Sequence, residues 1–422
     1  MRKFQMDYPI KLEFNKNPST KMHIDMNSCF ASVEQQANPR LRDKPIAVAA
    51  YDTPYSCILA PSVEAKRFGI KTGMRVKEGK ELCPNLIVLP PDPWKYRVVH
   101  MQLKKLLKKY TNDVVPKSID EFVLDFANYP IFKSGLHNVA TDIRQKIKQD
   151  VGDYIRVSIG IAPNRFLAKT AAGLHKPEGL DEINASNFRD VYSNLKLTDL
   201  CGIADRNAAR LNRAGINTVL DFYNAGNSVL QGAFESICGY YWYSRLRGWE
   251  IDNVEFGRKS YGNSYVLPKP LTGTALRPLL TKLVEKMGAR LRKAGYKAKG
   301  AHLSIMYEDH SDWHKGQVLE RFIFDSRDIY KEMFRLLLLA PQKSVRKLAV
   351  SCFNIVKETS TQLDLFKNIV EQQNFVKAID KTNTRWGDFV LTSARMMDTG
   401  SLAPDRIAFG GVKEMEEFSS PL

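Results

Sequence analysis

Three acidic residues in strand-like sequence are the strongest chemical signal in this 422-residue chain. Asp120 and Glu121 are adjacent in the run Ser118-Ile119-Asp120-Glu121, and Asp25 lies in an apolar stretch near the amino terminus. Carboxylates that are buried together repel one another and lose hydration, so they need a cation to stay ionised. An all-oxygen set with no His or Cys ligand suits Mg²⁺, which combines one or two carboxylates with waters and substrate phosphates. The acids therefore predict a magnesium site.

Adjacent acids can address one metal only where their strand is irregular. In a regular strand Asp120 and Glu121 would point to opposite faces, because successive side chains alternate. A turn or bulge removes this restriction, and Pro116 and Ser118 favour one at this point. An isolated Asp-Glu pair is usually an ordinary acidic turn, so the interpretation depends on the motifs around it.

The charge of the chain indicates a polyanionic partner. The formal net charge is +17 and the isoelectric point is near 9.4, and the commonest use of such a surface is nucleic-acid binding. A membrane surface is the competing polyanion, but the sequence shows no apolar run long enough to span a bilayer and no signal-peptide pattern. The six cysteines are scattered without a Cys-x-x-Cys pair, which argues against zinc and disulfides. We expect a soluble, cytoplasmic protein with no membrane partner.

Strand and helix patterns alternate over residues 21–179 and predict an α+β sheet domain with the metal on its open face. The strand that carries Asp25 runs into a helix, whose first backbone amides form an anion site beside the metal. Lys66 and Arg67, on a short basic helix, are candidates for phosphate contacts, and a solvated helix face is the alternative. Lys176 follows a later helix and is a further phosphate candidate.

Two segments farther along the chain suggest DNA binding. Residues 195–220 form short helices around glycines, a pattern typical of a helix-hairpin-helix, whose backbone amides approach DNA phosphates without reading sequence. A plain helical connector is the alternative. Beyond a polar linker, residues 256–356 give the strand and helix order of a ferredoxin-like βαββαβ domain. Its basic start, Arg258-Lys259-Ser260, favours contact with a duplex backbone.

Taken in order, these segments resemble the Y-family, lesion-bypass DNA polymerases of the DinB/UmuC type. The resemblance extends from about residue 22 to about residue 356 and depends on short motifs in matching order and spacing. The motifs are Ile24-Asp25-Met26-Asn27-Ser28-Cys29-Phe30, Ser118-Ile119-Asp120-Glu121, Val157-Ser158-Ile159-Gly160-Ile161-Ala162, Ala168-Lys169-Thr170-Ala171-Ala172, Lys176-Pro177-Glu178-Gly179 and Lys259-Ser260-Tyr261-Gly262.

The resemblance implies an α+β multidomain, right-hand polymerase with palm, fingers, helical thumb and ferredoxin-like little finger. The implied ranges are 1–21 for an N-terminal extension, 22–32 and 85–180 for the palm, 33–84 for the fingers, 181–250 for the thumb with its helix-hairpin-helix, 251–258 for a linker, 259–356 for the little finger and 357–422 for a tail.

The resemblance also assigns roles within the site. Asp25, Asp120 and Glu121, with the Met26 carbonyl, would hold two Mg²⁺ ions, and Glu121 would belong mainly to the ion that activates the primer 3′-hydroxyl. Phe30 occupies the position of the family's steric gate, which excludes ribonucleotides. The other candidates contact nucleotide or DNA. They are Asn27, Ser28, Cys29, Phe30, Ser62, Lys66 and Lys176 for the nucleotide, and Gly202, Ala204, Lys259 and Ser260 for DNA.

One departure from the family pattern affects the triphosphate site. Many relatives have Tyr and Arg where this chain has Val63 and Lys66. Lysine neutralises phosphate but does not form the two-pronged contact of arginine, and valine has no hydroxyl. We expect either weaker nucleotide binding or compensation by Ser62 or Arg67.

The tail contains Gln362-Leu363-Asp364-Leu365-Phe366, which is similar to the peptide by which bacterial polymerases bind the sliding clamp. The expected anchors are Gln362, Leu363, Leu365 and Phe366 in a flexible segment. Farther on, Asn383-Thr384-Arg385-Trp386-Gly387-Asp388 resembles the C-terminal extension of UmuC-like members.

The prediction is a monomeric, template-directed DNA polymerase of low fidelity that uses primer-template DNA and dNTPs to extend primers past damaged bases, in DNA repair and the SOS response. The low fidelity follows from the resemblance alone. Two other classes remain open. A metal-dependent nuclease could use the same carboxylates, and an inactive DNA-binding or clamp-binding scaffold would also be basic.

Overall fold

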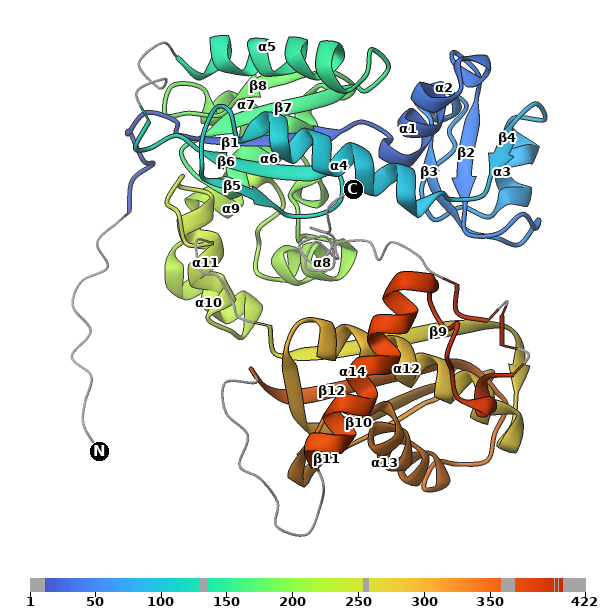
Figure 1. The fold of residues 1–422 in the computed structure, drawn as a ribbon. Helices are drawn as coiled ribbons and strands as arrows, with labels where there is room; N and C mark the ends of the chain where they lie inside the picture. Colours follow the sequence, from blue (N-terminus) through green and yellow to red (C-terminus); the bar gives the residue numbers. More distant parts are fainter. Residues whose placement is uncertain are drawn as a thin grey trace, which may run out of the picture. The chain divides into compact units, whose positions relative to one another are not determined.

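The computed structural model describes residues 12–129, 135–252, 258–357, 369–397, 399–400 and 402–404 (Figure 1). Contacts within the chain divide it into two units, with the division between Glu255 and Phe256. None of the helices in the described ranges has both the length and the apolar character needed to cross a membrane. Each unit has its own sheet and core.

The first unit is built on a five-stranded sheet in the order β5-β6-β1-β7-β8. The strands are β1 (Lys21–Met26), β5 (Val114–Pro116), β6 (Glu121–Asp125), β7 (Val157–Ala162) and β8 (Leu180–Glu182). The central strand β1 pairs antiparallel with β6 and β7, which places Asp25 opposite both Glu121 and Ser158. Neighbours directly opposite one another share a face, so Asp25 and Glu121 lie on the same side of the sheet.

The other face of this sheet is apolar and packs on helices α4 (Pro93–Leu107) and α5 (Leu136–Lys146). Alternation along β1 puts Met22, Ile24 and Met26 on this face, and all three are buried. The core therefore fixes which side of β1 carries the acids. A short π-helical segment, Ile147–Val151, continues α5.

Helix α6 (Arg165–Leu174) lies against the face that carries the acids. Gly160 on β7 is opposite His23 on β1, and a Cβ at Gly160 would lie only 2.1 Å from the Ala168 carbonyl oxygen and 2.2 Å from the Ala172 nitrogen. Only glycine allows the helix backbone to approach the strand this closely. The contact fixes the distance between α6 and the acidic face.

A second, three-stranded sheet in the first unit has the order β3-β2-β4. It consists of β2 (Ile46–Ala49), β3 (Ile58–Pro61) and β4 (Ile87–Leu89), with α2 (Val63–Arg67) and α3 (Val76–Leu82) following β3. Helix α1 (Cys29–Ala37) and the 3₁₀ helix Pro39–Leu41 connect β1 to this sheet. The parallel pairing of β4 with β2 extends the small sheet beyond residue 84.

Short helices complete the first unit. They are α7 (Phe188–Asn194), the 3₁₀ helix Leu197–Asp199, α8 (Asp205–Arg213), α9 (Val219–Asn224), α10 (Asn227–Phe234) and α11 (Cys238–Arg245). Their core is aromatic: Trp242 packs against Phe166, Phe222 and Phe234. Gly202 has a φ of +100°, a conformation that favours glycine, in the turn that leads to α8.

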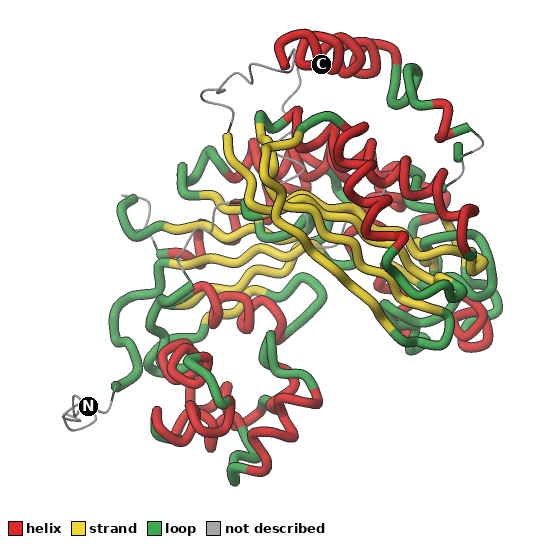
Figure 2. Tube along the Cα trace, turned by 90° about the horizontal axis from the view of Figure 1, so that it is seen from below, coloured by secondary structure: helices red, strands yellow, loops and turns green. Residues whose placement is uncertain are grey.

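The second unit has the predicted βαββαβ order. Its elements are β9 (Ser260–Leu271), the 3₁₀ helix Gly273–Leu276, α12 (Arg277–Lys293), β10 (Tyr296–Tyr307), β11 (Asp312–Ile323), α13 (Ser326–Leu338) and β12 (Val345–Lys357). The antiparallel sheet has the order β11-β10-β12-β9, so each helix connects two strands that are separated by a third. This confirms the split βαβ prediction. Figure 2 shows the long strands with helices along one side.

The tail contains a helix that the sequence analysis did not predict. Helix α14 (Ile369–Trp386) is in the second unit (Figure 1). Arg292 on α12 donates to Asp380 through two hydrogen bonds of 2.7 and 2.8 Å. Gln372 donates to Asp325 and Asp328. Residues 369–386 of the tail therefore form a regular helix that packs within the second unit. The clamp-binding peptide predicted at Gln362, Leu363, Leu365 and Phe366 lies outside the described residues.

Candidate active site

The irregularity predicted at the acidic pair is present. Strand β6 begins at Glu121, and Asp120 lies in the bend before it, where the Glu121 carbonyl accepts from the backbone nitrogens of Lys117 (2.8 Å) and Ser118 (3.4 Å). The Asp120 carbonyl accepts from the Met26 nitrogen at 2.9 Å, which ties the bend to the end of β1. Asp120, Glu121 and Asp25 therefore come together at one end of the central strands.

The three carboxylates line two cavities, with different acids in each. The first, of about 490 Å³, is lined by Asp25 and Asp120. The second, of about 750 Å³, is lined by Glu121 together with His23 and Lys169. The bend thus directs the two adjacent acids to different cavities.

Each cavity supplies a lysine to one carboxylate. The Lys176 ammonium lies 2.8 Å from Asp25 Oδ1, and the Lys169 ammonium lies 2.8 Å from both oxygens of Glu121. Burial raises the pKa of Asp25, and Lys176 only partly opposes this effect. Burial also raises the pKa of Asp120, while a hydrogen bond from the Ser118 hydroxyl lowers it in part. Asp25 and Asp120 therefore need more positive charge than Lys176 supplies.

His23 is a neighbour of the site that the sequence analysis missed. It is 1% exposed, and neither ring nitrogen has a hydrogen-bond partner among the described residues. Its Nε2 lies 4.0 Å from Glu121, and burial lowers the pKa of His23 to about 4, so the ring is neutral at neutral pH. The expectation of an all-oxygen site with no nearby histidine is therefore corrected. The available signal was position, because His23 precedes Asp25 by two residues and shares its face.

The donor set fits a divalent cation. One oxygen of Asp25, one of Glu121 and a nitrogen of His23 lie within 4.8 Å of one another, with Asp120 close enough to raise the pKa of Asp25 further. Buried carboxylates with raised pKa values are stabilised when a cation joins them. Oxygen-rich ligands of this kind suit hard cations such as Mg²⁺ and Mn²⁺.

Most of the predicted nucleotide contacts line the first cavity. They are Asn27, Ser28, Cys29, Phe30, Lys66 and Lys176, and the Phe30 ring stacks on Tyr96 with centroids 4.3 Å apart. The Asn27 backbone nitrogen, however, donates to the Arg156 carbonyl at 2.9 Å, so this amide is not available to a triphosphate. Helix α1 begins at Cys29 after Ser28, which leaves the amides of the first turn without partners in the helix.

Ser62 is the predicted nucleotide contact that the structure places elsewhere. Its side chain is fully buried, and its hydroxyl caps α2 by accepting from the Ala65 nitrogen at 3.1 Å. Val63 and Arg67 do line the first cavity. Compensation for the missing family residues can therefore come from Arg67 and not from Ser62.

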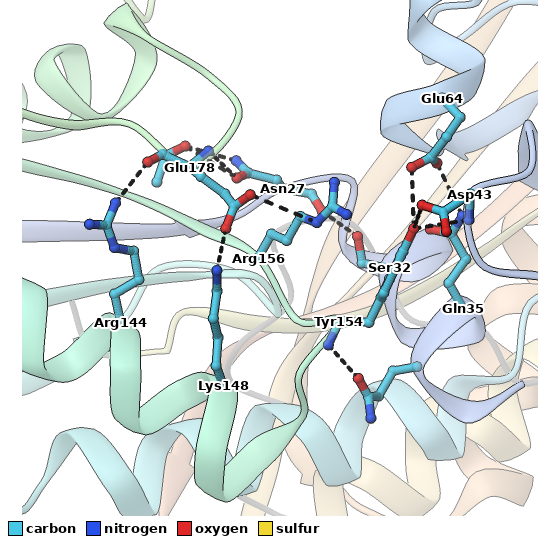
Figure 3. Close-up of polar contacts among 12 residues, drawn as sticks. Asn27, Ser32, Gln35, Asp43, Glu64, Arg144, Lys148, Tyr154, Arg156 and Glu178 are labelled. Carbon is cyan, nitrogen blue, oxygen red and sulfur yellow. Dashed lines mark hydrogen bonds and ion pairs between the residues drawn. The ribbon is translucent and has the colours of Figure 1, made fainter. Parts of the chain in front are cut away.

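A polar network holds the two loops that border the first cavity (Figure 3). The Asn27 side chain accepts from the Glu178 nitrogen at 2.8 Å, and the Ser32 hydroxyl donates to the Asn27 carbonyl at 2.7 Å. Lys148 forms an ion pair with Glu178 at 2.7 Å, and Arg144 donates to the Glu178 carbonyl at 3.0 Å. Asn27 thus positions the turn after Asp25 and the loop that carries Lys176, which is a structural role.

Sequence and structure comparisons now show the family. Residues 24–173 match the impB/mucB/samB family model, and residues 258–365 match the model of the C-terminal domain of that family. A DNA polymerase IV of Moorella thermoacetica is 31% identical over 379 residues, which cover 88% of this chain and 94% of the relative. A DNA polymerase IV 1 of Bacillus subtilis is 31% identical over 376 residues, which cover 86% and 90%.

Comparison with solved structures indicates the same family. A Y-family DNA polymerase chimera of Dbh and Dpo4 matches with a TM-score of 0.71 and 26% identity over 80% of this chain and 99% of the chimera. The chain belongs to the Y-family of DNA polymerases. An insertion ternary complex of Dbh DNA polymerase matches with a TM-score of 0.59 and 25% identity, over 80% and 99% of the two chains. The family, the multidomain α+β fold and the DNA-directed DNA polymerase activity predicted from the sequence are confirmed.

The predicted DNA contacts of this Y-family polymerase lie in both units. Gly202 lines the second cavity, and the Ala204 carbonyl starts α8 by accepting from the Ala208 nitrogen at 2.9 Å. Lys259 and Ser260 are exposed at the start of β9 in the second unit. Their contacts with DNA stay predictions.

Proposed function

We propose that this Y-family polymerase extends primers past damaged template bases by two-metal nucleotidyl transfer with Mg²⁺. The observation that carries the proposal is the division of the acids between two cavities. Asp25 and Asp120 face one cavity with Lys66 and Lys176, while Glu121 faces the other. A reaction that joins a triphosphate to a hydroxyl must bring two substrates to shared metal ligands, and a cavity on each side of the acids gives each substrate a place.

The first cavity fits the incoming dNTP. Lys66, Arg67 and Lys176 supply positive charge for the triphosphate, and the Phe30 ring, held against Tyr96, would exclude a ribose 2′-hydroxyl. The second cavity would take the primer end, with Glu121 near its 3′-hydroxyl. The bound ions would lower the pKa of that hydroxyl and stabilise the leaving pyrophosphate.

The same proposal covers the partners. The Dbh structure is an insertion ternary complex, and we infer primer-template DNA and dNTPs as substrates here. The exposed face of the second unit, opposite α12 and α13, would contact duplex backbone beginning at Lys259 and Ser260. We further propose a monomer in the cytoplasm that binds a sliding clamp through residues 362–366.

A labelled primer-template assay tests the function. Extension that requires Mg²⁺ and dNTPs supports a polymerase, shortening of the primer supports a nuclease, and binding without either change supports a scaffold. Templates with and without a damaged base, compared in the same assay, test lesion bypass. Retention of full extension past undamaged bases with a complete stop at every lesion would contradict the bypass part of the proposal.

Charge-removing variants test the metal site. Asp120→Ala and Glu121→Ala should abolish extension and leave DNA binding largely intact, because the acids hold metal and not duplex. Glu81→Gln on α3, exposed in the small sheet region, is the matched control and should behave as the parent. Normal extension by both the Asp120 and the Glu121 variants would refute the assignment.

A further inference from the structure

Lys169 makes the most complete ionic contact with any proposed metal ligand. Its ammonium lies 2.8 Å from each oxygen of Glu121, and the side chains are 36% and 18% exposed. This contact places the ammonium directly on both oxygens of a proposed metal ligand.

The position of Lys169 is built into the fold. Helix α6 packs against β7 at Gly160, where even one Cβ would meet the helix backbone. His23 on β1 is opposite Gly160 in the sheet and lies beside Glu121. The glycine contact therefore holds the helix that carries Lys169 directly over the strand end that carries Glu121.

Lys169 and a metal compete for the same oxygens. Glu121 has two carboxylate oxygens, and both contact the ammonium. Asp25 lies opposite Glu121 in the sheet, so a second carboxylate is close to this contact. A metal bound by Glu121 would share these oxygens with an ammonium of like charge, and the repulsion between the two cations favours displacement of Lys169.

The second cavity provides a place for the displaced ammonium. Lys169 lines it together with Lys117, Arg165 and Arg210. Arg165 is 3.8 Å from Glu250, an ion pair that leaves the group of cations with net positive charge. Such a cluster fits a phosphate of the primer strand.

We propose that Lys169 is a positioning residue that occupies the place of the hydroxyl-activating cation at Glu121 and moves to a primer phosphate when metal binds. The contact holds both Glu121 oxygens in place before substrate arrives. The exchange would couple metal entry to primer binding, since the same ammonium serves both. This inference deepens the proposed function and depends on it.

Manganese binding to the DNA-free protein, measured by electron paramagnetic resonance, tests the exchange. Lys169→Met and Lys169→Gln should bind Mn²⁺ about tenfold more tightly than the parent, because the competing charge is gone. Lys169→Arg keeps the charge and should stay within about twofold of the parent. Lys105→Met, an exposed lysine on α4 across the sheet, is the control and should change nothing.

Two further measurements separate the possible failures. Primer-template affinity of Lys169→Met should show a salt dependence weaker by about one phosphate contact. Parental Mn²⁺ binding should be lost in Glu121→Gln, and if it is not, the proposed metal site itself is wrong. If that variant loses Mn²⁺ while both charge-removing Lys169 variants bind it no more tightly than the parent, the metal site stands and the exchange is refuted.

Discussion

Two carboxylates, Asp25 in the first unit and Asp325 in the second, have pKa values that are shifted in opposite directions although burial acts to raise both. Burial raises the pKa of Asp25, and Lys176 does not fully oppose it. Burial also acts to raise the pKa of Asp325 in the second unit, but hydrogen bonds from Arg327 and Gln372 outweigh it and hold the pKa below its usual value. The first carboxylate is left in need of a cation, and the second is satisfied by its own chain.

This difference distinguishes a ligand-binding carboxylate from a structural one. A carboxylate satisfied by the protein stabilises the fold, whereas one that is not satisfied lowers stability and favours a ligand. The unpartnered ring of His23 belongs to the same region as Asp25. Asp25 in the first unit is therefore suited to bind a ligand at a cost in stability, whereas Asp325 in the second unit stabilises the fold.

The largest difference is expected between two variants that each remove one negative charge, at Asp25 and at Asp325. Asp25→Asn should lower the extension rate by about 10³-fold or more, as expected when a ligand of the reacting metal is lost. Its metal-free melting temperature should be equal to or above that of the parent, because a poorly satisfied charge is gone.

Asp325→Asn should do the reverse. It removes hydrogen bonds from Arg327 and Gln372, so it should destabilise the second unit by about 1–3 kcal/mol in urea unfolding. Its extension rate on undamaged template should stay near that of the parent below the unfolding transition. A large loss of stability in Asp25→Asn and none in Asp325→Asn would break the comparison.

The packing of α6 on the first sheet gives the next largest effect. Gly160→Ala should destabilise the first unit by about 3 kcal/mol, since its Cβ would meet helix backbone that has no freedom to move away. Gly232→Ala on α10 is the matched control, with no atom within 4 Å of the added Cβ, and should stabilise by about 0.5–1 kcal/mol. Equal unfolding midpoints for the two variants would contradict the close approach of α6.

Regular elements were predictable from the sequence, and contacts between distant elements were not. The βαββαβ order is evident because each strand and helix of the second unit is long, with strands of 12 or 13 residues. The four-residue β3 and three-residue β4 were missed because such short segments show no clear alternation. The Lys169 contact was missed although its motif was recognised, because Glu121 is 48 residues away and the pairing depends on Gly160.

Discrimination against ribonucleotides should change less in a Phe30 variant than the extension rate changes in Asp25→Asn. Phe30→Ala should raise ribonucleotide incorporation relative to dNTP by about 10- to 100-fold, because the ring that lines the first cavity is removed. Phe30→Tyr keeps the ring and should keep discrimination close to that of the parent. Single-turnover insertion of matched dNTP and rNTP measures both. Unchanged rejection of ribonucleotides by Phe30→Ala would place the gate elsewhere.

The smallest effect is expected at Lys66. Lys66 lines the first cavity, where burial and the nearby Lys176 lower its pKa. Lys66→Arg should lower the KM for dNTP about threefold with little change in kcat, because arginine forks onto two phosphate oxygens.

The difference between Lys66→Arg and the parent should widen as the pH rises above neutral, since the lowered pKa makes Lys66 lose its proton at a lower pH than an ordinary lysine and arginine stays protonated. Arg67→Met is the companion variant, because Arg67 lines the same cavity and can supply the missing contact. If Arg67→Met raises the KM more in the parent than in Lys66→Arg, Arg67 compensates for the family arginine. Equal effects in both backgrounds would show that Lys66 and Arg67 act independently. This polymerase would then bind the triphosphate more weakly than relatives that have the arginine.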